Sequence, residues 1–136
     1  MKHGICLILL LILSGSLLAA EYAVVVHPDN QTQVSPEVLL QIFKKETTIW
    51  EDGTNVIVYV PKKSKVTDAL LKALGSSKKE VDTHFLLLRE QASHILPPKR
   101  KRFATAQKLV RRNRSAIAVV KKSQAQDFKV LLNFSS

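Results

Sequence analysis

Residues 35–60 read SPEVLLQIFKKETTIWEDGTNVIVYV, and this stretch carries the signals of a helix, a turn and a strand. Ser35 can cap the exposed N–H groups of a helix, and Pro36 is preset for the first helical position. Apolar residues follow at helical spacing, and residues 55–60 form an apolar run that Pro61 stops. The inner side of the helix is predicted to hold Val38, Leu39, Ile42 and Phe43.

The rest of the chain alternates in the same way between short apolar runs and helical patterns. Besides residues 55–60, strands are predicted at residues 22–26, 116–120 and 129–132. The strand at 22–26 is apolar throughout, which is typical of burial on both faces of a parallel sheet. The pattern predicts one α/β domain with a small mixed or mostly parallel sheet of about four strands and helices on its faces.

Three further helices are predicted after the second strand. The first is capped by Ser64 and ends at Gly75. Ser77 and Glu80 form a predicted capping box for the next, which runs to about Ser93. The last one breaks near Asn113. The inward residues of these three helices are predicted to be Val66, Ala69, Leu70, Ala73, Leu74, Val81, Phe85, Leu88, Ala92, Phe103, Ala106, Leu109 and Val110.

Residues 1–20 have the order of a secretory signal, with a basic start, a short apolar run and small residues up to Ala20. We expect cleavage near Ala20, a single domain over residues 21–136 and a periplasmic or secreted location; an uncleaved N-terminal anchor is the alternative. Cys6 lies inside the apolar run, so a lipoprotein is not expected, and the mature domain has no disulfide. Loss of Lys2 lowers the formal charge from +10 to +9, which favours anionic partners.

Signatures of common enzyme sites are missing from the sequence. His84 and His94 lie ten residues apart instead of one helical turn, and four glycines leave little room for phosphate-cradling loops. Glu51 and Asp52 form an adjacent carboxylate pair, but their place before Gly53 is typical of a turn. We therefore expect no enzyme activity, no cofactor and no metal.

Residues 42–53, IFKKETTIWEDG, resemble a segment of the periplasmic phosphate-binding proteins of ABC transporters, and more closely their short single-domain relatives. In that family a serine-led helix ends in Ile-Phe and is followed by a tryptophan and a polar turn before a strand. Residues 114–119 resemble the closing strand of the family. The residues that fall in register are Ser35, Ile42, Phe43, Trp50 and Gly53. The resemblance implies a fold like one lobe of a type II periplasmic binding protein.

The same resemblance implies an anion site in the loop after the second strand, where the family holds phosphate with hydroxyls and N–H groups at a helix start. Ser64 keeps its family position, whereas Val60 stands where the family has an arginine and lysines replace its glycines. The implied anion-binding residues are Ser64, Thr67, Lys62, Lys63 and Lys65. Family members close two domains over phosphate, and this chain has room for one.

Two functions follow as hypotheses. The first is an exported solute-binding-like domain for phosphate or a related small oxyanion, associated with phosphate ABC transport and with a membrane transporter or sensor as partner. The alternative is a basic surface that binds polyanions such as lipopolysaccharide or acidic wall polymer; nucleic acid is disfavoured because aromatic residues are few. That surface would contain Lys99, Arg100, Lys101, Arg102, Arg111, Arg112 and Arg114, with Lys121 and Lys122 beside them. Simple solvation of helix faces by these charges is a third reading.

Overall fold

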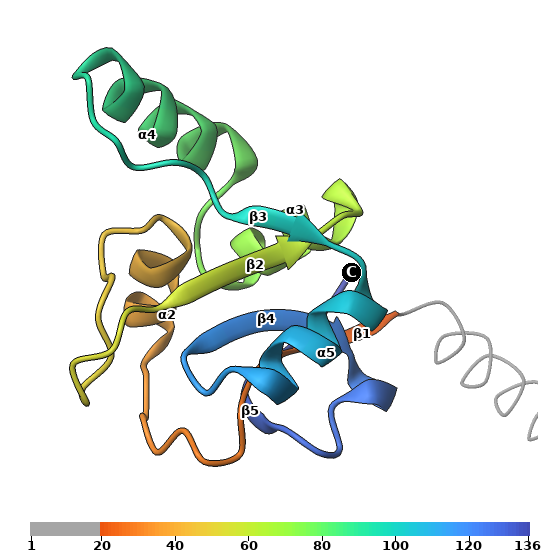
Figure 1. Cartoon of the computed structure of the whole chain (residues 1–136). Helices are drawn as coiled ribbons and strands as arrows, with labels where there is room; N and C mark the ends of the chain where they lie inside the picture. Colours follow the sequence, from red (N-terminus) through yellow and green to blue (C-terminus); the bar gives the residue numbers. More distant parts are fainter. Residues whose placement is uncertain (1–19) are drawn as a thin grey trace, which may run out of the picture.

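The computed structural model describes residues 20–136, so the expected export signal lies, except for Ala20, outside the described residues. These residues form one mixed sheet with helices on both faces (Figure 1). The strands are β1 (Glu21–Val26), β2 (Ile57–Pro61), β3 (Lys99–Lys101), β4 (Ala116–Lys121) and β5 (Lys129–Ser135). The helices are α2 (Pro36–Phe43), α3 (Ser64–Ala73), α4 (Lys78–Glu90), α5 (Phe103–Arg112) and the 3-10 turn η1 (Lys122–Gln124). Within this part of the chain, no helix combines the length and apolar character needed to cross a membrane.

The sheet has the strand order β3-β2-β4-β1-β5. β2 runs parallel to both β3 and β4, whereas β1 runs antiparallel to both β4 and β5. The predicted α/β class and mixed sheet are confirmed, with five strands instead of about four. The strand that the sequence did not reveal is β3, because its three basic residues have no apolar pattern and pair with β2 through the backbone alone.

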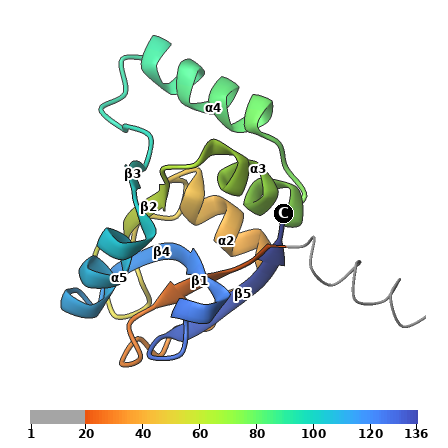
Figure 2. The same cartoon turned by 90° about the vertical axis from the view of Figure 1, so that its right-hand side faces the viewer.

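Two apolar clusters lie on opposite faces of the sheet. Figure 2 shows α2 and α3 on one of these faces and α5 on the other. Val24 and Val26 of β1 face α2 and α3, whereas Ala23 and Val25 face α5. The predicted burial of this strand on both faces is therefore confirmed. Its predicted parallel pairing is wrong: both neighbours are antiparallel, and the burial comes from helices that cover both sides of the sheet.

The loop between α2 and β2 is fixed by Trp50, whose side chain is buried. Its indole Nε1 donates a hydrogen bond to the carbonyl oxygen of Ser115 at 2.8 Å. The same carbonyl accepts the N–H of Ile57 at 3.0 Å. This contact ties the loop to the ends of β2 and β4 at which these strands begin.

The helix starts agree with the sequence in part. Ser35 caps α2 by accepting the N–H of Val38 at 3.2 Å, and Ser77 caps α4 by accepting the N–H of Glu80, also at 3.2 Å. The predicted capping box is only half formed, because the Glu80 carboxylate accepts the Ser76 hydroxyl at 2.9 Å. The predicted Ser64 cap is wrong. Lys63 occupies the cap position of α3, and its side chain makes no capping hydrogen bond.

α4 and the segment that follows it project from the sheet and its helices (Figure 1); residues 78–98 are called the α4 arm. Phe85 is the buried residue of α4, and its neighbours Leu86 and Leu87 are exposed. Two predicted inward residues, Ala73 of α3 and Ala92 of the arm, are also exposed. The helix ends at Glu90 instead of Ser93, and Ala92 has a positive φ of 57°.

Candidate anion-binding site

The parallel strands β2, β3 and β4 end side by side and are followed by cationic residues. β2 leads through Lys62 and Lys63 into α3, which covers one face of the sheet. β3 leads through Arg102 into α5, which covers the opposite face. Helices that leave neighbouring parallel strands toward opposite faces open a crevice at the strand ends, and this is where ligands bind in open α/β sheets.

Both helices begin without a side-chain cap. The N-cap residues are Lys63 for α3 and Arg102 for α5, and neither side chain can accept a hydrogen bond. Among residues 20–136 there is no hydrogen-bond acceptor for the N–H groups of residues 63–65 or 103–105. Free N–H groups and the positive end of the helix dipole make such starts favourable for anions.

One cavity of about 490 Å³ lies against the start of α5 and the end of β2. We call it the basic hollow; its lining residues are Lys62, Lys63, Lys101, Arg102, Phe103, Ala104, Lys121 and Gln124. Five of these eight residues are cations and none is an acid. Lys121 Nζ lies 5.9 Å from the centre of the Phe103 ring, which stacks on Tyr22. The basic hollow therefore offers positive charge and free N–H groups to the same volume.

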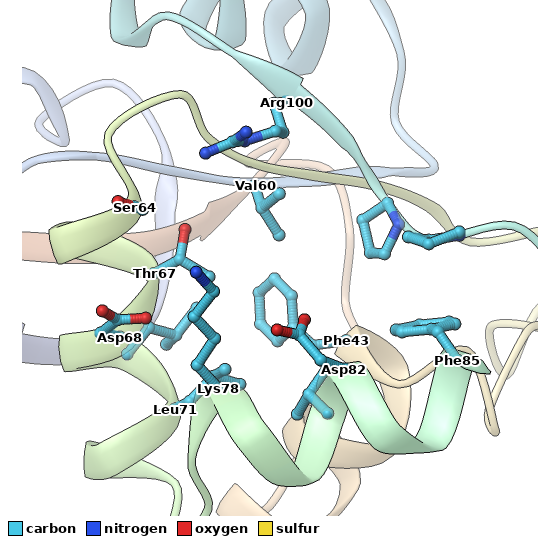
Figure 3. A pocket seen from close by; sticks show the side chains of 14 residues that line it. Phe43, Val60, Ser64, Thr67, Asp68, Leu71, Lys78, Asp82, Phe85 and Arg100 are labelled. Atoms are coloured by element: carbon cyan, nitrogen blue, oxygen red, sulfur yellow. The ribbon is translucent and has the colours of Figure 1, made fainter. Parts of the chain in front are cut away.

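A second cavity, of about 250 Å³, lies on the other side of the α3 start, between α3, α4 and residues 97–100 (Figure 3). We call it the mixed hollow. Ser64, Thr67 and Arg100 line it together with apolar side chains and two aspartates. The Thr67 hydroxyl donates to the carbonyl oxygen of Pro61 at 3.5 Å, and Arg100 Nη2 donates to that of Lys62 at 3.2 Å.

The two hollows divide the residues expected from the family resemblance. Lys62 and Lys63 line the basic hollow, whereas Ser64 and Thr67 line the mixed hollow. Lys65 is exposed on α3 and lines neither. The structure therefore does not gather the five expected residues around one volume.

The residues of the alternative polyanion surface are also separated. Lys99 is exposed at the start of β3, Arg100 lines the mixed hollow, and Lys101 and Arg102 line the basic hollow. Arg111, Arg112 and Arg114 lie at the far end of α5, and a helix of ten residues is about 15 Å long. Arg111 also approaches the Asp127 carboxylate at 4.0 Å and the Phe128 ring at 5.6 Å. These seven residues do not form one continuous patch.

Four residues that line the basic hollow were not predicted from the sequence to bind an anion: Phe103, Ala104, Lys121 and Gln124. One signal was present in the sequence: Lys101 and Arg102 directly precede a helical pattern that lacks a Ser, Thr, Asp or Asn cap. Lys121 and Gln124 come from η1 and its flank, far along the chain, and only the strand order brings them beside the α5 start.

Two ionisable groups outside the hollows have shifted pKa values. Burial lowers the pKa of Lys45, and the positive charge of Lys99 lowers it further. The Thr54 hydroxyl and then the Thr54 N–H, both donating to the Asp52 carboxylate, lower the pKa of Asp52, and Arg114 adds to this effect. In residues 20–136, no three His, Cys, Asp or Glu side chains group in a way that could hold a metal ion.

No known family profile matches the sequence, and no curated protein is similar to it in sequence. Several solved structures share its fold, including the following two. A protein from Clostridium perfringens, described as a phosphate ABC transporter substrate-binding protein and solved with bound phosphate, aligns with 83% of this chain and 44% of its own, with a TM-score of 0.61 and 18% identity. An ABC-type phosphate transport receptor from Vibrio cholerae aligns with 83% of this chain and 46% of its own, with a TM-score of 0.54 and 16% identity.

The chain thus spans less than half the length of either protein. At these identities the likeness concerns the fold. The described residues, with their mixed sheet covered by helices on both faces, therefore have the fold of one lobe of a phosphate-binding protein.

Proposed function

We propose that this chain is an exported solute-binding-like domain that binds phosphate or a related small oxyanion in the basic hollow. One observation carries the proposal: five cations and the uncapped starts of two helices surround a volume whose lining contains no acid. The likeness in fold to phosphate-binding proteins supports the same ligand class. A membrane transporter or sensor that recognises the domain is part of the proposal, as are cleavage near Ala20 and a periplasmic or secreted location.

The chemistry of the basic hollow suits an anion that accepts several hydrogen bonds at once. The N–H groups of residues 103–105 donate along the α5 axis, and Arg102 offers a planar guanidinium that can donate two parallel bonds. Lys62, Lys63 and Lys121 add charge without a fixed geometry. A tetrahedral oxyanion has enough oxygen atoms to engage the helix start and the guanidinium together.

We expect the affinity to be modest. The hollow opens to solvent on one side of a single lobe, so water and salt screen its charges. The described residues form one lobe, and they span less than half the length of the two phosphate-binding neighbours. A Kd of about 1 mM corresponds to roughly −4 kcal/mol, and binding of that order is expected at low ionic strength.

Phosphate titration followed by amide chemical shifts tests the proposal. The N–H signals of residues 103–105 are expected to move most, followed by those of residues 63–65. Arg102→Gln is expected to raise the Kd about three- to tenfold, because a charge-assisted hydrogen bond is lost in a solvated site.

Arg112→Gln is the matched control, since it removes the same charge from the other end of α5 and is expected to leave the Kd unchanged. The proposal fails if millimolar phosphate moves neither helix start, or if Arg112→Gln weakens binding as much as Arg102→Gln does.

A further inference from the structure

The mixed hollow takes no part in oxyanion binding as proposed above, and its floor is apolar. Phe43 of α2, Val60 of β2 and Leu71 of α3 lie beneath it, and Phe85 of α4 closes one side (Figure 3). These residues come from four different elements. A volume of about 250 Å³ with such a floor can accept a short hydrocarbon segment.

The β3 side of the mixed hollow is cationic. Arg100 forms no ion pair with any carboxylate in residues 20–136, and the one hydrogen bond that its guanidinium makes within these residues goes to the carbonyl oxygen of Lys62. Figure 3 shows Arg100 of β3 above Ser64 and Thr67 of α3, with Asp68 next to Thr67 on the same helix and Asp82 farther from Arg100 on α4. The remaining guanidinium N–H groups can therefore bind an anionic head group, with two hydroxyls beside it.

Lys78 lies on the helix side with the two aspartates. Its positive charge offsets part of theirs. Asp68, Asp82 and Lys78 together carry one net negative charge, so the mixed hollow is polarised, with Arg100 on the β3 side and this negative charge on the side of α3 and α4.

A groove along the α4 arm continues the apolar floor. It has a volume of about 300 Å³ and shares Asp82, Phe85 and Pro97 with the mixed hollow. Leu86, Ile95 and Leu96 line the groove, with exposed fractions of 44%, 40% and 71%. We call it the arm groove. Large apolar side chains exposed together beside a cavity mark a binding surface.

We propose that the mixed hollow and the arm groove together bind a single-chain amphiphile with an anionic head. The head group contacts Arg100, with Ser64 and Thr67 as neighbours. The acyl chain passes Phe85 and Pro97 and lies against Leu86, Ile95 and Leu96. This occupant fits the two adjoining cavities, because Arg100 lines the mixed hollow and the exposed leucine and isoleucine side chains line the arm groove, in which Arg89 is the one cation.

Chain length provides the sharpest test. Octanoate, decanoate and dodecanoate are titrated into the protein by calorimetry, each below its micelle concentration. Burial of one methylene contributes about 0.8 kcal/mol, so the Kd is expected to fall about fourfold for each added methylene until the chain outgrows the arm groove. An unchanged Kd from octanoate to dodecanoate would contradict the proposal.

Paired variants locate the two ends of the ligand. Arg100→Gln is expected to weaken dodecanoate binding about three- to tenfold, and Arg112→Gln, which removes the same charge elsewhere, is expected to have no effect. Leu96→Asn is expected to weaken binding about threefold and to reduce the dependence on chain length. Val130→Asn on β5 alters an exposed apolar side chain outside both cavities and is expected to change neither.

Titration with a lysophosphatidylglycerol that carries a dodecanoyl chain distinguishes two kinds of anionic amphiphile, free fatty acids and phospholipid-derived molecules. Tighter binding than dodecanoate assigns the site to phospholipid-derived amphiphiles, and weaker binding assigns it to free fatty acids; either result supports an anionic amphiphile. Absence of binding by both compounds, or binding that Arg100→Gln and Leu96→Asn leave unchanged, overturns the proposal. Phosphate binding is tested separately through Arg102, so each proposal can fail alone.

Discussion

The central strands and the α4 arm are both rich in apolar residues but bury them very differently. Residues 116–120 of β4 are all buried, with helices over both faces of the sheet. In α4, Phe85 is buried while Leu86 and Leu87 stay 44% and 50% exposed. Burial of apolar side chains in the sheet therefore stabilises the fold, whereas part of the apolar surface of the arm stays exposed and lines a groove.

The largest expected difference is in the free energy of unfolding. Ile117→Ala removes a fully buried side chain from β4 and is expected to lower this free energy by about 2–5 kcal/mol. Leu87→Ala in the arm is expected to change it by no more than about 0.5 kcal/mol. Urea unfolding measures both. If both variants lose a similar free energy of unfolding, the arm is part of the core and the proposed difference between the two regions is wrong.

Substitution of Trp50, which lies at the opposite end of β2 from the hollows, is expected to have an intermediate effect on the free energy of unfolding. Trp50→Phe keeps an aromatic ring in the buried position but removes the hydrogen bond to the Ser115 carbonyl. Loss of this bond is expected to reduce the free energy of unfolding by about 1–2 kcal/mol. Urea unfolding and phosphate titration of the same variant check it: stability should fall while the Kd stays unchanged, and a changed Kd would show that the two ends are coupled.

The smallest expected effect is a loss of local stability in the α4 arm. Ser77→Ala removes the cap of α4, which contributes about 1 kcal/mol to the stability of a helix. Hydrogen exchange should accelerate at the amides of α4 and remain unchanged in β1 and β4, because a weakly packed helix opens locally. If the β1 and β4 amides lose protection equally, the arm and the sheet unfold as one unit.

The sequence was most informative where local chemistry and burial agree. Ser35 and Pro36 favour a helix start through local contacts that do not depend on where the helix packs. The apolar strands at 22–26 and 116–120 are buried as expected. Residues 35–53, which carry the family resemblance, include Trp50, which fixes the loop before β2. Trp50 lies away from both hollows, and Phe43 contributes only an apolar side chain to the mixed hollow, so the resemblance identifies the architecture more readily than the ligand.

The candidate site was harder to predict because it depends on which strands are neighbours. β3 has no apolar pattern, so neither its pairing with β2 nor the placement of Arg100 and Lys101 could be foreseen from local sequence. Ser64 was expected to cap α3, but the helix begins one residue earlier relative to that expectation, and its hydroxyl lines the mixed hollow. Antiparallel pairing of β1 was likewise hidden, since burial on both faces is compatible with either direction.

β3 forms the outermost strand on its side of the sheet, and one of its edges pairs with no other described strand. An open edge of this kind is a template on which a strand from a second molecule can add, which leads to aggregation. All three residues of β3 are Lys or Arg, and two copies brought edge to edge would repel each other. The cations that β3 contributes to both hollows therefore also oppose the addition of a second copy at this edge of the sheet.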